Sequence, residues 1–104
     1  MVKEITVDNL KIDIDNKLIF VIDVRENHEL QICKIEPCLH IPLQELQSRI
    51  NLLNMSNKYA VICHSGYRSK TACNLLNYYG YDVVNVIGGI NEWAIKVDQD
   101  MNRY

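Results

Sequence analysis

Short apolar runs rich in β-branched residues alternate along the chain with segments that carry apolar residues at helical spacing. The runs are predicted strands and lie at residues 18–24, 38–42, 59–63, 82–89 and, more weakly, 3–7. The first is apolar almost throughout, as expected of a strand covered on both faces. Strands separated by helices imply right-handed crossovers and a parallel sheet. The pattern therefore predicts an α/β fold, with a mostly parallel central sheet flanked by helices, in one domain of residues 1–104.

Three segments between these runs are predicted helices. One apolar stripe follows Pro42 and consists of Leu43, Leu46, Ile50 and Leu53. A second precedes Gly80, a residue suited to a left-handed C-terminal cap, and consists of Ala72, Leu75, Leu76 and Tyr79. Residues 7–17 fit both the alternation of a strand and a helix with an acidic start, and we expect a short helix there.

Composition and charge exclude several classes of function. The chain has 104 residues, of which 48% are apolar and 23% charged, and these values are ordinary for a soluble globular domain. A net charge of −2 gives no field that would attract nucleic acid or an anionic membrane. No apolar run approaches the roughly 20 residues of a spanning helix. Because charged residues occupy the place of a signal peptide's apolar centre, we expect a cytoplasmic protein.

The four cysteines are Cys33, Cys38, Cys63 and Cys73. In the reducing cytoplasm we expect thiols rather than disulfides. With no C-x-x-C pair and with isolated histidines, no metal site is predicted. Cys73 is expected to be a small core residue. For Cys33 and Cys38 packing is favoured, although a second thiol near a persulfide could resolve it as a disulfide.

Cys63 ends the predicted strand at 59–63, and the chain then turns through Gly66 into a helix that begins near Arg68. A free thiol, with a pKa of about 8.5, supplies little of the nucleophilic thiolate at neutral pH. Successive N–H groups in a tight loop form an anion-binding nest, and a helix N-terminus adds partial positive charge. Gly66 allows the positive φ that such a loop needs. With Arg68 as a cation at its rim, the loop is predicted to stabilise a thiolate or persulfide of Cys63.

A second predicted strand, at 18–24, contains Asp23 near its end and is followed by Arg25 and Glu29. In folds of this type active residues gather at the carboxyl ends of the strands. Asp23 and Arg25 could contact the Cys63 loop, but together with Glu29 we expect them to brace the strand end. An arginine at a helix start opposes the helix dipole, so Arg68 is expected to bind charge rather than to stabilise the helix.

Several of these motifs together resemble a single-domain rhodanese, and the resemblance covers nearly the whole chain. They are Asp23-Val24-Arg25 with Glu29, Ile41-Pro42, the loop Cys63-His64-Ser65-Gly66-Tyr67-Arg68-Ser69, and Gly88-Gly89 followed by Trp93. The resemblance implies a rhodanese-like three-layer fold and a sulfurtransferase without a cofactor, in which Cys63 carries sulfane sulfur as a persulfide. It also implies small donors such as thiosulfate, and thiol or cyanide acceptors.

Residues 28–46 and 88–104 are similar to the rhodanese module fused behind adenylating enzymes of molybdopterin and thiamine sulfur pathways. This similarity implies two kinds of protein partner. One is a cysteine desulfurase as donor, and the other is a ubiquitin-like sulfur carrier acting with its adenylating enzyme. The family usually has glycine and alanine before the Ile-Pro pair, whereas this chain has Pro37 and Cys38, so we expect a remodelled turn there.

Two other functions remain open. A cysteine-based phosphatase or arsenate reductase uses the same thiolate, amides and arginine, but its C-x5-R loop would require an arginine at Ser69. A non-catalytic binding module would keep the fold, although such modules usually lose the cysteine. We expect the loop residue His64 to be exposed. Trp93, in the last helix, is expected to pack that helix against the sheet.

Overall fold

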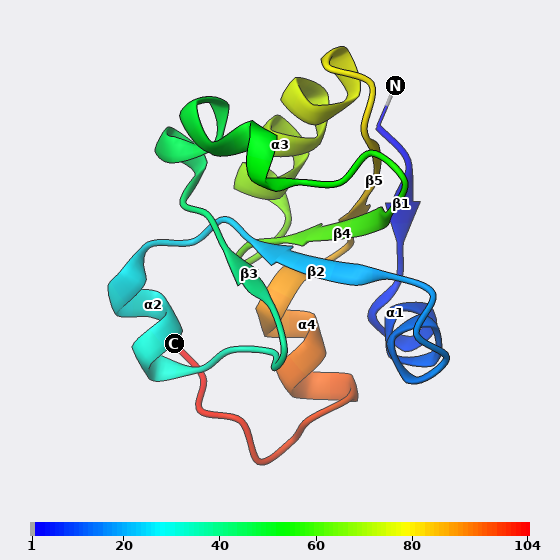
Figure 1. Cartoon of the computed structure of the whole chain (residues 1–104). Helices are drawn as coiled ribbons and strands as arrows, with labels where there is room; N and C mark the ends of the chain where they lie inside the picture. The colour runs from blue at the N-terminus through cyan, green and yellow to red at the C-terminus, as the bar shows by residue number, and fades with distance from the viewer. Residues whose placement is uncertain (1) are drawn as a thin grey trace.

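The computed structural model describes residues 2–104 and contains a five-stranded sheet in which all strand pairs are parallel. The strand order is β1-β5-β4-β2-β3 (Figure 1). The strands are β1 (Glu4–Ile5), β2 (Phe20–Asp23), β3 (Leu39–His40), β4 (Lys58–Ile62) and β5 (Asp82–Val86). The predicted α/β fold with a parallel sheet is confirmed, although β1 and β3 are shorter than the apolar runs that predicted them.

Three α-helices and two 3-10 helices connect the strands of the described chain, and a fourth α-helix follows β5. They are α1 (Val7–Asp15), α2 (Asn27–Ile32), η1 (Leu43–Glu45), η2 (Gln47–Leu52), α3 (Tyr67–Tyr78) and α4 (Gly89–Lys96). The short helix expected near the N-terminus is confirmed as α1, and the Thr6 hydroxyl caps it by accepting the Asn9 N–H at 3.2 Å. Within residues 2–104, no helix has the length and apolar character needed to cross a membrane.

The stripe after Pro42 does not form one amphipathic α-helix, and this prediction is corrected. The segment makes the two 3-10 helices η1 and η2 instead. A 3-10 helix has three residues per turn, so side chains three apart lie on one face. The apolar residues of this segment form two pairs with a spacing of three, Leu43 with Leu46 and Ile50 with Leu53. In each pair the second residue is buried in the core and the first is half-buried.

The buried face of α3 also differs from the prediction. It consists of Ser69, Ala72, Cys73 and Leu76, at the 3, 4 and 7 spacing of an α-helix. Tyr79 is exposed, so the buried stripe is shifted toward the start of the helix and includes a serine that apolar periodicity does not detect. Gly80 follows with φ +90°, which confirms the predicted left-handed cap.

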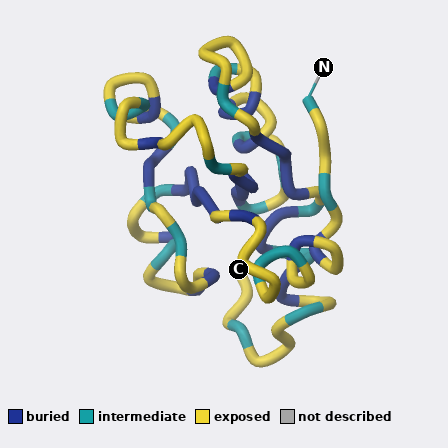
Figure 2. The backbone as a smooth tube through the Cα atoms, turned by 45° about the vertical axis from the view of Figure 1, so that its right-hand side comes forward, coloured by how far each residue is buried: buried dark blue, intermediate teal, exposed yellow. Residues whose placement is uncertain are grey.

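Two apolar clusters lie on the two faces of the sheet and make the fold three-layered. Val21, Ala60 and Ile62 point to one face, where they pack with residues of α1 and α4 that include the buried Trp93. Ile22, Tyr59, Val61 and Cys63 point to the other face, where they pack with α3 and the 3-10 segment. The sheet residues are buried along the centre of the molecule, whereas most loops are exposed (Figure 2).

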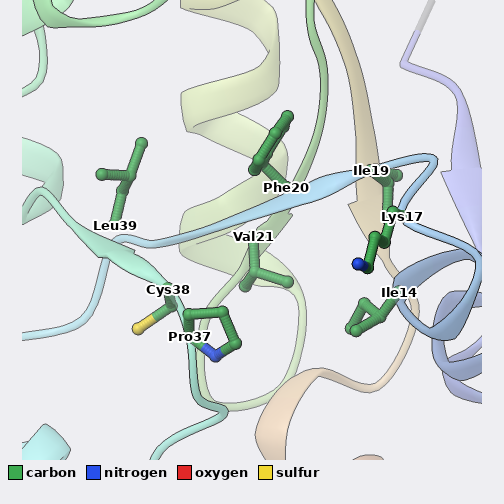
Figure 3. Close-up of a pocket in the computed structure, with 8 residues that line it drawn as sticks. All are labelled: Ile14, Lys17, Ile19, Phe20, Val21, Pro37, Cys38 and Leu39. Atoms are coloured by element: carbon green, nitrogen blue, oxygen red, sulfur yellow. The ribbon is translucent and has the colours of Figure 1, made fainter.

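The first half of β2 is less covered than predicted. β3 pairs with β2 only at Ile22 and Asp23, so Phe20 is 53% exposed. An apolar pocket of about 520 Å³ opens there, between the end of α1, β2 and the start of β3. Cys38 and Pro37 form part of its wall (Figure 3). Burial raises the pKa of the Cys38 thiol, which fits the expectation of a packing residue rather than a reactive one.

Candidate active site

The candidate active site lies at the carboxyl end of the central strand β4. Cys63 follows Ile62, and α3 begins only four residues later, at Tyr67. Gly66 is the N-cap of α3 and has φ +112°, the left-handed conformation that lets the loop turn sharply. The predicted strand, loop and helix around Cys63 are therefore present, with the thiol facing the N-terminus of α3.

The Cys63 sulfur is buried and surrounded by hydrogen-bond donors. The Gly66 N–H donates to Sγ at 3.1 Å, and the Ser69 hydroxyl lies 3.3 Å from it. Burial raises the pKa of the Cys63 thiol, but the Ser69 hydroxyl and the backbone amides of Ser69, Gly66 and Ser65 outweigh it. The pKa consequently lies below its ordinary value. This arrangement favours the thiolate, which is the nucleophilic form of cysteine.

Asn85 of β5 supports this loop and was not singled out in the sequence. It is buried, its Nδ2 donates to the Gly66 carbonyl at 3.2 Å, and its Oδ1 accepts the Ser69 hydroxyl. A signal was available, because Asn85 is a polar residue inside the apolar run "DVVNVIGG". Periodicity could not show which face of the sheet it occupies or which loop it contacts.

The start of α4 holds the first two loop residues from the other side. The amides of Ile90 and Asn91 donate to the carbonyls of Cys63 and His64 at 2.8 and 3.0 Å. Gly89, the residue before Ile90, has φ +57°. A Cβ at this position would overlap the Cys63 carbonyl oxygen and lie 2.6 Å from the His64 carbonyl oxygen. The Gly88-Gly89 pair thus allows α4 to approach the loop closely.

Arg68, the cation expected at the rim of the loop, is paired with a carboxylate of α2. Its Nη1 and Nη2 donate to Oε1 and Oε2 of Glu29 at 2.6 and 2.8 Å, in a bidentate ion pair. The hydrogen bonds from Arg68 hold the pKa of the Glu29 carboxyl well below its usual range, against the effect of burial. The Glu29 carboxylate therefore pairs with the cysteine loop, whereas its backbone carbonyl accepts a hydrogen bond from Arg25 Nη1 at 3.4 Å, so Glu29 contacts both the loop and the strand end.

Asp23 and Arg25 form a buried pair of their own, as the bracing interpretation expects. The Arg25 side chain is fully buried, and its Nη2 lies 2.8 Å from Asp23 Oδ2. The same guanidinium donates to the carbonyl of Cys33 at 2.7 Å and to the Tyr104 hydroxyl at 2.9 Å. Arg25 thus connects the end of β2 to the end of α2 and to the C-terminal tail.

The rest of the loop differs in exposure. Tyr67 is 83% exposed and Ser65 is exposed, so both lie at the surface. His64 is half-buried, because its ring stacks on that of Tyr104 with centroids 4.1 Å apart. The expectation of an exposed His64 is therefore wrong, since a tail residue 40 positions away covers it. Beside the loop, a groove of about 360 Å³ is lined by residues that include Tyr67 and Lys70.

The other cysteines are free thiols in packed positions. Cys33 and Cys38 belong to the apolar cluster on the α1 and α4 face, whereas Cys63 lies in the cluster on the opposite face. Cys73 shares the Cys63 cluster, and burial raises its pKa to about 12, so it is a weak nucleophile. Among residues 2–104, no group of three or more His, Cys, Asp or Glu side chains is placed to hold a metal ion.

The chain is thus a parallel α/β domain in which loop amides lower the pKa of a single buried thiol. Residues 6–96 match the Rhodanese-like domain family, and the chain belongs to this family. A sulfurtransferase of Allochromatium vinosum is 31% identical over 96 residues, which are 90% of each chain. YtwF of Bacillus subtilis is 36% identical over 94 residues, which are 88% of this chain and 90% of YtwF. Sulfur transfer is therefore the general class of function to which the chain is related.

Other relatives are longer than this chain. It spans 48% of YrkF of Bacillus subtilis, at 38% identity over 89 residues. It spans 19% of the adenylyltransferase and sulfurtransferase MOCS3-2 of Zea mays, at 35% identity over 92 residues, which confirms the expected similarity to such modules. Among solved structures, a rhodanese-related protein of Thermoplasma volcanium has a TM-score of 0.87 and 37% identity, covering 91% of this chain and 93% of that one.

Proposed function

We propose that the protein is a sulfurtransferase in which Cys63 carries sulfane sulfur as a persulfide from a donor to a thiophilic acceptor. One observation carries the proposal: the buried Cys63 sulfur accepts the Gly66 amide at 3.1 Å and has a lowered pKa. A thiolate in this place attacks the outer sulfur of a donor, and the bond between that sulfur and the leaving group breaks. The amides that stabilise the thiolate can then hold the outer sulfur of the persulfide.

Thiosulfate, a small donor, contains an outer sulfur that a thiolate can attack. The persulfide of a cysteine desulfurase contains one as well. The acceptor would be a thiol, cyanide or the activated C-terminus of a ubiquitin-like sulfur carrier. The similarity to MOCS3-2 supports the last of these, with the adenylating enzyme acting in trans. Tyr67 and the groove beside it offer an exposed surface for such a partner. Four free cysteines suit a reducing compartment such as the cytoplasm.

The thiol chemistry of phosphatases and arsenate reductases is less compatible with this loop. Four residues separate Cys63 from Arg68, and the Arg68 guanidinium is already bound to Glu29. A tetrahedral oxyanion would need both a larger loop and a free guanidinium. We therefore expect aryl phosphate hydrolysis at background level.

Mass spectrometry after incubation with a sulfur donor tests the proposal. The parent protein should gain the mass of one sulfur atom on Cys63, and cyanide should remove it as thiocyanate. Cys63→Ser should abolish the gain because the attacking thiolate is absent. Both thiosulfate and a small persulfide should be offered, so that a preference for one donor is not mistaken for inactivity.

Variants of the other thiols are the matched controls for Cys63→Ser. Cys33→Ser, Cys38→Ser and Cys73→Ser should keep most of the transfer, since two lie across the sheet and the third has a raised pKa. Loss of turnover in a folded variant of these three would point to a dithiol relay and contradict a single-thiol mechanism.

A further inference from the structure

Both guanidinium groups around the candidate site are already neutralised by carboxylates. The Glu29 carboxylate receives four donors: Arg68 Nη1 and Nη2, the Glu26 N–H at 3.0 Å and the Tyr104 hydroxyl at 2.7 Å. Its side chain is only 8% exposed, so these donors hold it in one orientation. Arg25 is fully buried against Asp23. Each cation therefore has a fixed partner of opposite charge.

This pairing determines the charge that an incoming sulfur donor meets. With the two ion pairs cancelled, a Cys63 thiolate leaves the immediate site with one net negative charge. Two other cations lie near the loop, Lys70 and Arg103, which donates to Asn91 Oδ1 at 3.4 Å; both are exposed, and solvent screens their charges. If Arg68 turned toward a donor, the carboxylate of Glu29 would stay behind, buried and without its cation, which is strongly unfavourable. A donor with two negative charges thus finds the guanidinium groups of Arg25 and Arg68 already occupied.

Resting on the proposed function, we infer that Glu29 sets the donor preference of the site. By occupying Arg68, Glu29 selects against dianionic donors such as thiosulfate. It favours donors whose transferable sulfur carries at most one charge, that is, the persulfide of a thiol. Glu29 does not touch the reacting sulfur in this proposal and acts as a specificity-determining residue through Arg68.

The favoured step is a thiolate exchange that needs no oxidant. The Cys63 thiolate attacks the outer sulfur of R–S–SH, a new S–S bond forms, and R–S⁻ leaves with the electron pair of the broken bond. The negative charge of the Cys63 thiolate leaves with R–S⁻, and the proton stays on the transferred sulfur. With thiosulfate the same attack must bring a monoanion and a dianion together and release sulfite as a dianion. Repulsion at the encounter is therefore specific to thiosulfate.

The test compares the rate constants for sulfur uptake by Cys63 from thiosulfate and from cysteine persulfide. In the parent, uptake from cysteine persulfide should be at least about tenfold faster than from thiosulfate. Glu29→Gln frees Arg68 and should raise the thiosulfate rate about tenfold or more, the effect of one charge-assisted hydrogen bond to an anion. The persulfide rate should change much less, roughly threefold at most, because its repulsion is small.

Three matched variants separate charge from structure. Glu29→Asp keeps the carboxylate and should stay poor with thiosulfate. Glu36→Gln removes an exposed carboxylate that pairs with Lys34, and should leave both rates unchanged. Lys58→Gln removes an exposed cation at the opposite end of β4 and should also leave the donor preference unchanged, and a shift as large as that of Glu29→Gln would overturn the role assigned to the Arg68 pair.

Ionic strength gives a readout that does not depend on a variant folding. Like charges react faster as salt screens their repulsion, so thiosulfate uptake by the parent should rise with salt, whereas in Glu29→Gln, where the freed Arg68 balances the thiolate, it should change little. A parent that uses thiosulfate as fast as cysteine persulfide, or loses thiosulfate rate with salt, would overturn the inference alone. If Cys63 takes sulfur from neither donor, the proposed function itself fails.

Discussion

The Ser69 hydroxyl has one proton and two neighbours that can accept it. The Asn85 Nδ2 donates to the Gly66 carbonyl, so Asn85 presents its oxygen to Ser69 and accepts that proton. The neutral Cys63 thiol can then donate its own proton to Ser69 Oγ, which lies 3.3 Å away. Once Cys63 ionises, the hydroxyl can turn from Asn85 to the thiolate. Ser69 is thus the side chain that responds to the charge on Cys63.

Ser69→Ala should raise the pKa of the Cys63 thiol, since one hydrogen bond to the charged form, contributing about 1.5 kcal/mol, is lost. The measurement is the pH dependence of Cys63 alkylation by iodoacetamide, whose midpoint should move upward. At neutral pH the alkylation rate should fall accordingly. Ser48→Ala removes an exposed hydroxyl far along the chain and is the control. An unchanged midpoint would mean that the backbone amides alone stabilise the thiolate.

At the scale of the element, the site depends on how closely α4 approaches the loop after β4. The amides of Ile90 and Asn91 hold the carbonyls of Cys63 and His64, and the absence of a side chain at Gly89 makes this possible. Because the first loop residues are fixed in this way, the amides that follow can converge on the sulfur. The Gly88-Gly89 pair therefore does more than allow a backbone turn with positive φ. It also lets α4 lie close enough to hold the Cys63 loop in place.

Gly89→Ala should slow sulfur uptake by Cys63 by about tenfold or more, because the new Cβ would displace the loop carbonyls and misalign the donors. Gly80→Ala is the matched control. It has φ +90° and carries a similar backbone penalty of about 1 kcal/mol, but its Cβ would meet only the end of the Met55 side chain. Both variants should lose some thermal stability, and equal uptake rates in the two would contradict this role of α4.

At the scale of the whole molecule, Glu29 joins three parts that are far apart in the sequence. It belongs to α2, binds Arg68 of α3 and accepts the hydroxyl of Tyr104 in the C-terminal tail. The tail returns beside α2 (Figure 1). There burial raises the pKa of Tyr104 to about 12, so its hydroxyl remains a donor at neutral pH. The Glu29 carboxylate consequently both neutralises Arg68 at the site and anchors the C-terminal tail through Tyr104.

Glu29→Gln should lower the free energy of unfolding at neutral pH by about 1–3 kcal/mol, the range for hydrogen bonds to a charged group. The native pKa of Glu29 lies below its unfolded value of about 4.3, so this stabilisation is complete above that pH and declines as the pH falls below it. Urea titrations of the parent and variant should therefore converge in acid. A difference that is constant from pH 7 to acid would show that the charge of Glu29 contributes nothing.

The sequence by itself determined the features that depend on local pattern. The alternation of apolar runs and helical stripes indicated the parallel sheet, because side-chain periodicity follows directly from backbone geometry. The strand that leads to Cys63, the glycine of the loop and the helix after it all lie within residues 58–78. Their proximity in space follows from their proximity in the chain, and the family motif around them added the chemistry.

Only the tertiary structure decided which side chains meet around that thiol. The partner of Arg68 is 39 residues away, the cover of His64 is at the end of the chain, and Asn85 reaches Ser69 from another strand. Segment 43–53 forms 3-10 helices because its pairs of apolar residues are three apart and contact the sheet in short turns. The periodicity of the sequence assigns a residue to one face of a helix or strand. Which side chains then meet across the fold depends on how the helices pack on the sheet, and this packing involves residues from the whole chain.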